Sequence, residues 1–170
     1  SQSPTNVSDN GYDSSTGLGF RLGWLGHMSS KFSMGLTYQA RTHMTKLDKY
    51  KGLFADNGSF DIPSNYALGL KYQTCPKTVI ALDVMRINYS ESPSVGNSLN
   101  PAMANGVALG TSNASGFGWD DQTIIKIGVA YKYNQKLTLR AGYNHGNNPI
   151  PNKETLFNMI APGVTENHAT

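Results

Sequence analysis

Charged residues are scarce in this chain of 170 residues. Asp, Glu, Lys and Arg make up 15% of it, against about 25% in ordinary soluble domains. The 14 basic and 11 acidic residues leave a formal charge of +3 that is spread along the sequence. A basic patch typical of nucleic-acid-binding proteins is therefore missing, and we expect no nucleic-acid partner.

Cysteine and long apolar runs are scarce as well. The single Cys75 excludes an internal disulfide, and the four histidines lack the spacing of metal ligands. Mean hydropathy is −0.39, and no segment approaches the about 18 consecutive apolar residues of a membrane-spanning helix. These absences exclude a helical membrane protein but not a membrane β-barrel, in which half of the strand residues face a polar lumen. The first residues show no signal-peptide pattern, so we expect a processed or partial chain.

Apolar side chains alternate with small polar ones in six segments, which is the period of β-strands with one apolar face. In the clearest segment, Phe32, Met34 and Leu36 lie opposite Ser33 and Gly35. The predicted strands cover residues 18–24, 32–43, 66–73, 80–89, 125–133 and 137–144.

Short and long connections alternate between these strands. Tight turns are predicted at 29–31, 75–77 and 134–136, and long loops at 44–65 and 90–121. Outer-membrane barrels have this arrangement, with short periplasmic turns and long extracellular loops.

The predicted fold class is all-β, an antiparallel membrane β-barrel segment of about six strands. Runs of roughly 9–13 residues match the about 9–11 that cross a bilayer, and aromatic rings gather near both strand ends. The strands lie within 17–147, between extracellular segments at 1–16 and at 148–170, the latter with a short helix. Because the smallest membrane barrels have eight strands, the rest of a larger barrel or other copies must cover the sheet edges.

Cations on the polar faces are the first candidate ligand-binding groups. A lumen lined by small polar residues and fixed positive charges suits the passage or capture of carboxylates. Alternatively, these cations pair with acids such as Asp83. Five candidates occupy strand positions on the polar face: Arg21, Arg41, Lys71, Lys126 and Arg140. The sixth, Arg86, stands beside a bulge that is expected near Met85–Arg86.

Apolar residues in the long loops are candidates for ligand capture. The first loop places basic residues beside Leu47, Tyr50, Leu53 and Phe54, which suits an anionic apolar ligand or lipopolysaccharide, although a packed, solvated loop has the same pattern. The second loop contributes Phe117 and Trp119, which are equally explained by close backbone packing or a girdle anchor.

Several segments carry a resemblance to a known family in addition to these physical patterns. Residues 60–69, 116–123, 139–144, 149–151 and 156–163 resemble the FadL/TodX family of outer-membrane transporters. The resemblance implies a barrel of about 14 strands with an N-terminal plug, located in the bacterial outer membrane. It also implies uptake of long-chain fatty acids or other hydrophobic compounds. The family's pair of basic pocket residues matches no motif here.

The predicted function is passive uptake of such compounds, without catalysis or a cofactor. No nucleophile elbow or phosphate-binding loop is present in the sequence, and no metal site is expected. Two alternatives stay open: a surface-exposed structural or adhesive β-protein that binds a partner through its long loops, and a soluble β-sandwich.

Overall fold

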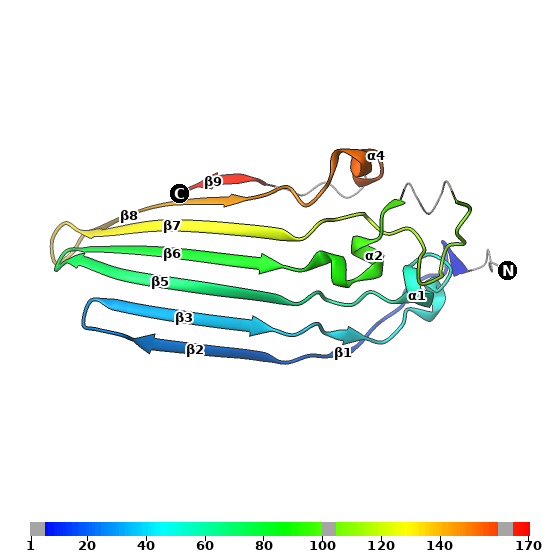
Figure 1. Cartoon of the computed structure of the whole chain (residues 1–170), viewed down its shortest axis with the longest axis horizontal. Helices are drawn as coiled ribbons and strands as arrows, with labels where there is room; N and C mark the ends of the chain where they lie inside the picture. The colour runs from blue at the N-terminus through cyan, green and yellow to red at the C-terminus, as the bar shows by residue number, and fades with distance from the viewer. Residues whose placement is uncertain (1–5, 100–104, 160–164) are drawn as a thin grey trace.

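The computed structural model describes residues 6–99, 105–159 and 165–170, and its main feature is one antiparallel sheet (Figure 1). Seven strands are hydrogen-bonded in chain order, so the sheet is an up-and-down meander whose edges are β2 and β9. The strands are β2 (Arg21–His27), β3 (Phe32–Gln39), β5 (Asn65–Cys75), β6 (Thr78–Ile87), β7 (Gln122–Lys132), β8 (Thr138–Gly146) and β9 (Asn167–Ala169). The all-β antiparallel class predicted from the sequence is confirmed, and the single open sheet contradicts a β-sandwich.

All three tight turns lie at one end of the sheet, the turn end, whereas the long loops gather at the opposite loop end (Figure 1). The turns are closed locally. Met28 N–H donates to Phe32 O at 2.9 Å, and Asn134 Oδ1 accepts from the backbone N–H groups of Lys136 and Leu137 at 2.8 and 2.9 Å. Asparagine is suited to such turns because its side chain replaces a backbone acceptor.

The remaining regular elements are short and lie at the loop end. A two-stranded ribbon pairs β1 (Gly17–Leu18) with β4 (His43–Met44). The helical turns are η2 (Asp48–Tyr50), α1 (Ala55–Gly58), η3 (Tyr89–Glu91), α2 (Pro93–Gly96), η4 (Asn152–Glu154) and α4 (Thr155–Asn158). Within the described ranges, no helix is long and apolar enough to cross a membrane.

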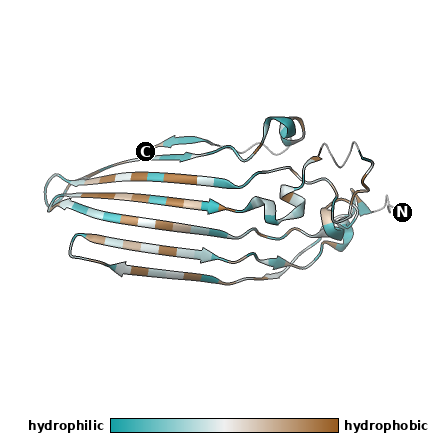
Figure 2. Cartoon of the chain, viewed as in Figure 1, coloured by the Kyte–Doolittle hydropathy of each residue, from teal (hydrophilic) through white to brown (hydrophobic). Residues whose placement is uncertain are grey.

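The two faces of the sheet differ in chemistry. Directly paired residues share a face, and Leu70, Leu82 and Ile127 are paired in one row across three strands. We call their face outward and the opposite one inward. Brown and pale positions alternate along the strands in Figure 2, as the period-2 pattern predicts.

Large apolar side chains on the outward face have no protein cover: Leu22 is 62% exposed, Leu139 is 53% exposed and Trp24 is 48% exposed. In contrast, the buried aliphatic residues Ala55, Val95 and Ala114 lie in the loops. An apolar surface of this extent requires an apolar neighbour.

Three details differ from the sequence expectations. Residues 167–169 add a seventh strand within the tail that was predicted to hold only a loop and a short helix. Strand β3 has eight residues and is shorter than the predicted 32–43, whereas β2 has seven residues and begins three positions later than the predicted 18–24. Their pairing resumes beyond a break as the β1–β4 ribbon, because residues 42–44 turn aside to meet residues 61 and 62.

The predicted bulge near Met85–Arg86 is wrong. Strand β6 stays in register with both neighbours through Ile87, and the irregularity lies between Gln73 and Cys75 instead. The prediction failed because it counted Ile87 and Tyr89 with the outward row. Ile87 faces inward in register with Asn65, and Tyr89 has already left the sheet.

The first long loop turns sharply at Gly58, and this turn yields a stability prediction. Its φ is +92°, and a Cβ there would lie 2.5 Å from Leu47 O. We expect Gly58→Ala to destabilise the loop by about 1–2 kcal/mol through backbone strain and the clash. Trypsin cleavage after Lys51 measures the effect, and Gly11→Ala is the control, since Gly11 also has a positive φ (+70°) but an open surrounding. Equal effects of both substitutions would show that the clash contributes nothing.

Candidate functional site

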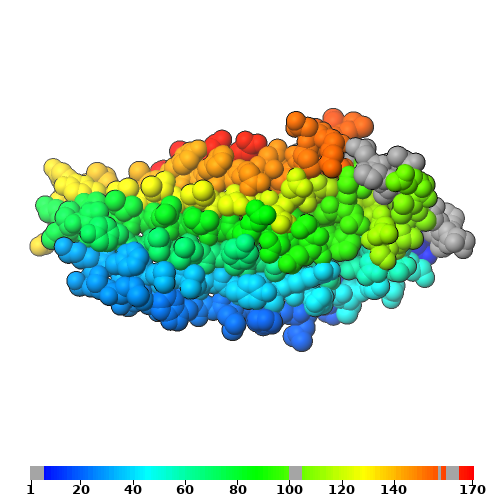
Figure 3. All heavy atoms as spheres, in the orientation of Figure 1, coloured from blue at the N-terminus to red at the C-terminus, as the bar shows by residue number. Residues whose placement is uncertain are grey.

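An apolar cavity of about 310 Å³ lies at the loop end. It is lined by Phe60, Asp61, Ile62, Pro63, Tyr89, Val95, Phe117 and Trp119. We call it the loop pocket. The Tyr89 and Trp119 rings meet edge to face, with centroids 5.1 Å apart at 90°, and Phe117 lies 6.2 Å from Trp119. The lining residues come from the two long loops, and Figure 3 shows these loops and the tail packed side by side at this end of the molecule.

The wall formed by residues 60–63 is held by Asp61, which is 5% exposed. Arg41 Nε donates to Asp61 Oδ2 at 2.8 Å, and Met44 N–H donates to Oδ1 at 2.8 Å. His43 Nδ1 lies 3.2 Å from Oδ2. Burial raises the pKa of Asp61, but the Met44 N–H and the Arg41 guanidinium outweigh this effect and hold the pKa below its usual range. The carboxylate is therefore charged and already bound on its protein side.

The wall formed by Tyr89 is held by Asp121. Its carboxylate accepts from Ser90 N–H at 3.0 Å and from Ser90 Oγ at 2.8 Å, and Arg86 Nη2 donates to it at 3.1 Å. Burial raises the pKa of Asp121, but these donors lower it below its usual range. Burial also raises the pKa of Tyr89, so its phenol contributes a neutral ring to the pocket.

The aromatic wall is fixed from the tail. Trp119 Nε1 donates to Asn158 Oδ1 at 2.6 Å, and Asn158 Nδ2 donates to Phe117 O at 2.8 Å. Gly118, between the two aromatic residues, has φ +70°, and a Cβ there would lie 2.5 Å from Glu154 Cγ. Close backbone packing and pocket lining, which were alternatives in the sequence, therefore occur together.

The four capture candidates predicted in the first loop do not line the pocket. Phe54 packs on Phe60 at 5.3 Å, and Tyr50 Oη donates to Gly11 O at 2.6 Å. Leu47 is half-buried and Leu53 is exposed. Of the six residues predicted for capture, the structure thus brings only Phe117 and Trp119 into the pocket. The loop cations are also engaged, since Lys46 lies 3.5 Å from Asp56 and Lys49 Nζ donates to Tyr12 O at 2.6 Å.

Two of the six predicted lumen cations are placed differently from the expectation. Arg86 faces outward, in register with Tyr66 and Thr123, and is paired with Asp121. It is not a lumen residue, because β6 has no bulge that would turn it inward. Arg41 lies beyond the end of β3 and is bound to Asp61, so its charge is used to hold the loop.

The other four cations, Arg21, Lys71, Lys126 and Arg140, share the inward face. Within the described residues, none of them has an acidic group within 4.0 Å. Lys126 lies in direct register with Asp83, whose Oδ1 would be 2.7 Å from a Cβ on Gly69. The Asp83 carboxylate therefore leans toward β5 and away from Lys126.

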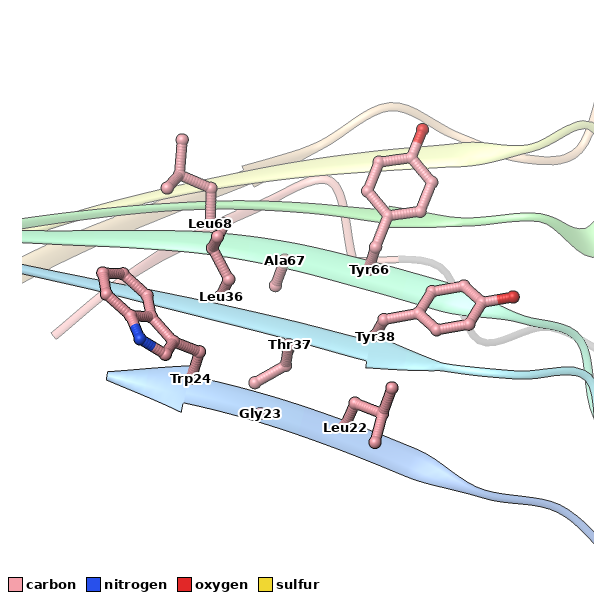
Figure 4. Close-up of a pocket in the computed structure, with 9 residues that line it drawn as sticks. All are labelled: Leu22, Gly23, Trp24, Leu36, Thr37, Tyr38, Tyr66, Ala67 and Leu68. Atoms are coloured by element: carbon pink, nitrogen blue, oxygen red, sulfur yellow. The ribbon is translucent and has the colours of Figure 1, made fainter. Parts of the chain in front are cut away.

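A second hollow, of about 350 Å³, lies on the outward face over β2, β3 and β5. Figure 4 shows Trp24, Leu36, Leu68, Leu22, Tyr38 and Tyr66 projecting around it. Because these side chains belong to the row that needs an apolar neighbour, the hollow is part of a lipid-facing surface. It is distinct from the loop pocket.

Sequence patterns missed Asp61, Tyr89 and Asn158. Asp61 and Asn158 stand inside the segments that resemble the FadL/TodX family, which is the one signal that marks them. Tyr89 was assigned to a strand.

In the described part of the chain, no three His, Cys, Asp or Glu side chains are grouped to hold a metal ion.

An open antiparallel meander with an uncovered apolar face, a polar inward face and long loops at one end is part of the wall of a membrane β-barrel. The chain belongs to the outer membrane protein transport protein family (OMPP1/FadL/TodX), whose model matches residues 2–159. This membership confirms the family resemblance and the outer-membrane location.

Similar solved structures agree with this fold. The Pseudomonas putida toluene transporter TodX has a TM-score of 0.56 and 23% identity, covering 91% of this chain and 39% of its own. The CymD monoaromatic hydrocarbon channel has a TM-score of 0.51 and 18% identity, covering 78% of this chain and 38% of its own. The chain thus spans about two fifths of the structures it matches. A search of curated proteins finds no match.

Proposed function

We propose that this chain forms part of the wall and entrance of an outer-membrane channel for the passive uptake of hydrophobic small molecules, with neutral aromatic compounds as the preferred class. The loop end faces the outside in this proposal. The observation that carries the proposal is the loop pocket, whose apolar and aromatic lining gathers where the long loops meet. Apolar pockets with few polar groups are typical of small-molecule sites.

Size and charge support a neutral ring. An apolar cavity of about 150 Å³ is enough to bind benzene, and the loop pocket has about 310 Å³. The charged group in its lining is the Asp61 carboxylate, which is already paired with Arg41, so no cation among the described lining residues faces a fatty-acid carboxylate. The similar solved structures are a toluene transporter and a monoaromatic hydrocarbon channel, which is consistent with this class.

Long-chain fatty acids are the second candidate class. The observation that favours them is the set of inward cations without acidic partners among the described residues, namely Arg21, Lys71, Lys126 and Arg140. Fixed positive charges on the inner wall would attract a carboxylate during passage.

The test of the pocket is toluene uptake into vesicles that contain the complete barrel. We expect Trp119→Ala to raise the toluene concentration at half-maximal uptake about tenfold, because loss of the indole costs roughly 1.4 kcal/mol of aromatic contact. The control is Trp24→Ala, which removes the chain's other tryptophan from the outward face and should leave uptake unchanged. Unchanged uptake with Trp119→Ala would refute capture in the loop pocket.

The same vesicles separate the two substrate classes. Lys126→Met should slow oleate uptake severalfold and leave toluene uptake unchanged if fatty acids pass along the inward cations. Equal oleate uptake with and without Lys126 would remove the support that this cation gives to the fatty-acid class. No uptake of either compound above that of empty vesicles would refute transport and favour a structural or adhesive role.

A further inference from the structure

Asn158 lies behind the loop pocket without lining it, at the last position of α4 in the tail. It is 4% exposed. Its amide makes three hydrogen bonds: Oδ1 accepts from Trp119 Nε1 at 2.6 Å, while Nδ2 donates to Phe117 O at 2.8 Å and to Glu154 O at 2.9 Å. One buried side chain thus contacts both aromatic residues of the pocket wall.

Both donor hydrogens of Asn158 and its oxygen are used in these bonds. An asparagine amide has two N–H donors and one acceptor oxygen. Only the observed orientation of this side chain makes all three hydrogen bonds, and any other orientation loses at least one of them. The contact with Trp119 is specific in direction, because an indole N–H only donates and must find an acceptor when buried. Asn158 therefore determines which way the indole plane of Trp119 lies.

The tail that carries Asn158 is itself anchored to the second long loop. Glu154, 1% exposed, accepts hydrogen bonds from Leu99 N–H at 3.1 Å and from Ser98 Oγ. Asp120 N–H donates to Pro149 O at 2.8 Å. The α4 turn is short, so these anchors, rather than helix propensity, hold Asn158 in place.

The Trp119 ring also meets the Tyr89 ring edge to face, with the ring centroids 5.1 Å apart. The indole is therefore held by the Asn158 amide at its N–H and by the Tyr89 ring, which lines the pocket with it. We propose that Asn158 is a positioning residue for ligand capture: it fixes the Trp119 indole against Tyr89, and so sets the shape of the aromatic wall presented to a neutral ring. This inference rests on the proposed function of the loop pocket.

The test is a double-mutant cycle in the complete barrel, with toluene uptake into vesicles as the readout. Asn158→Leu keeps the approximate size of the side chain but cannot accept a hydrogen bond from the indole N–H. Trp119→Phe keeps an aromatic ring but removes the N–H donor. We expect Asn158→Leu to raise the toluene concentration at half-maximal uptake about three- to tenfold, the loss of a typical buried hydrogen bond, while the maximal rate changes little. In the Trp119→Phe background, the same substitution should change this concentration by a smaller factor, because the bond to the indole is already absent and only the Nδ2 bonds to Phe117 O and Glu154 O remain to be lost.

A second readout separates positioning from general damage to the loops. Trp119 fluorescence, with the other tryptophans of the barrel replaced by phenylalanine, should shift on Asn158→Leu if the indole loses its partner. The inference is overturned if Asn158→Leu leaves the toluene concentration at half-maximal uptake unchanged. It is also overturned if Asn158→Leu changes this concentration as much in the Trp119→Phe background as in the unsubstituted protein. If Trp119→Ala itself has no effect on uptake, capture in the pocket fails, whereas a Trp119→Ala effect without an Asn158→Leu effect refutes the positioning role alone.

Discussion

Replacing Leu82 by arginine is expected to destabilise the barrel by about 2–4 kcal/mol, the cost of an arginine on the lipid face near the bilayer centre. Leu82 lies midway along β6 on the outward face, paired with Leu70 and Ile127. An arginine there has only apolar neighbours on both adjacent strands. Urea unfolding of the complete barrel in lipid vesicles, compared with the unsubstituted protein, measures the loss.

The matched control is Met85→Arg, three residues further along the same strand. Met85 faces inward, in register with Ala67 and Ile124, on the face that also carries Lys71, Asp83 and Lys126 and that would line the lumen of the complete barrel. We expect Met85→Arg to change the unfolding free energy by less than about 1 kcal/mol, because lumen positions tolerate charge. A cost for Leu82→Arg no larger than that for Met85→Arg would mean that the two faces are assigned the wrong way round.

The side of the sheet that most strand residues face was predictable, because each strand has its own alternation of apolar and polar residues. Phe32, Met34 and Leu36 alternate with Ser33 and Gly35, and a strand has only two sides, so the parity of a few residues orients the whole element. The prediction fails where a residue leaves the strand, as Tyr89 does, since periodicity cannot show where a strand ends. Tyr89 and Ile87, an apolar residue on the inward face, together produced the false bulge and the wrong placement of Arg86.

The loop pocket could not be predicted from periodicity. Asp61, Tyr89 and Asn158 come from three different loops, and their proximity depends on the order of strands in the sheet and on long-range hydrogen bonds. Phe117 and Trp119 were identified because they form an aromatic and glycine cluster just before the fifth predicted strand. Arg41 was predicted as a free lumen cation because the sequence does not show that Asp61, twenty positions later, folds back to bind it.

Asp61 should therefore decide whether the first long loop stays closed. We expect Asp61→Asn to lower the free energy of local loop opening by about 2 kcal/mol, since hydrogen bonds to a charged group contribute roughly 1.5–3 kcal/mol. The neutral amide keeps the size of the carboxylate but loses the attraction to Arg41, which is 31% exposed. Trypsin cleavage of the folded barrel at Lys46, Lys49 and Lys51 reports loop opening, and its rate should rise roughly 30-fold.

Asp56→Asn is the control, because it removes an acid from the same loop. The Asp56 carboxylate lies 3.5 Å from Lys46 Nζ, and both side chains are 46% exposed. Such a solvated pair contributes less than about 1 kcal/mol, so we expect at most a few-fold change in the cleavage rate. A similar increase for both variants would show that the buried Asp61 contacts do not hold the loop.

Acid should imitate the Asp61 substitution. The pKa of Asp61 in the folded protein is below the ordinary value of 3.8, so its charged contacts stabilise the loop above about pH 3.8. This contribution is lost as the pH falls through the lowered pKa, because the native carboxylate must then take up a proton. Exchange of the Met44 amide hydrogen, which donates to Asp61, should accelerate in this range relative to its intrinsic rate. Asp61→Asn should remove that pH dependence, and an unchanged dependence in the variant would assign the titration to a different group.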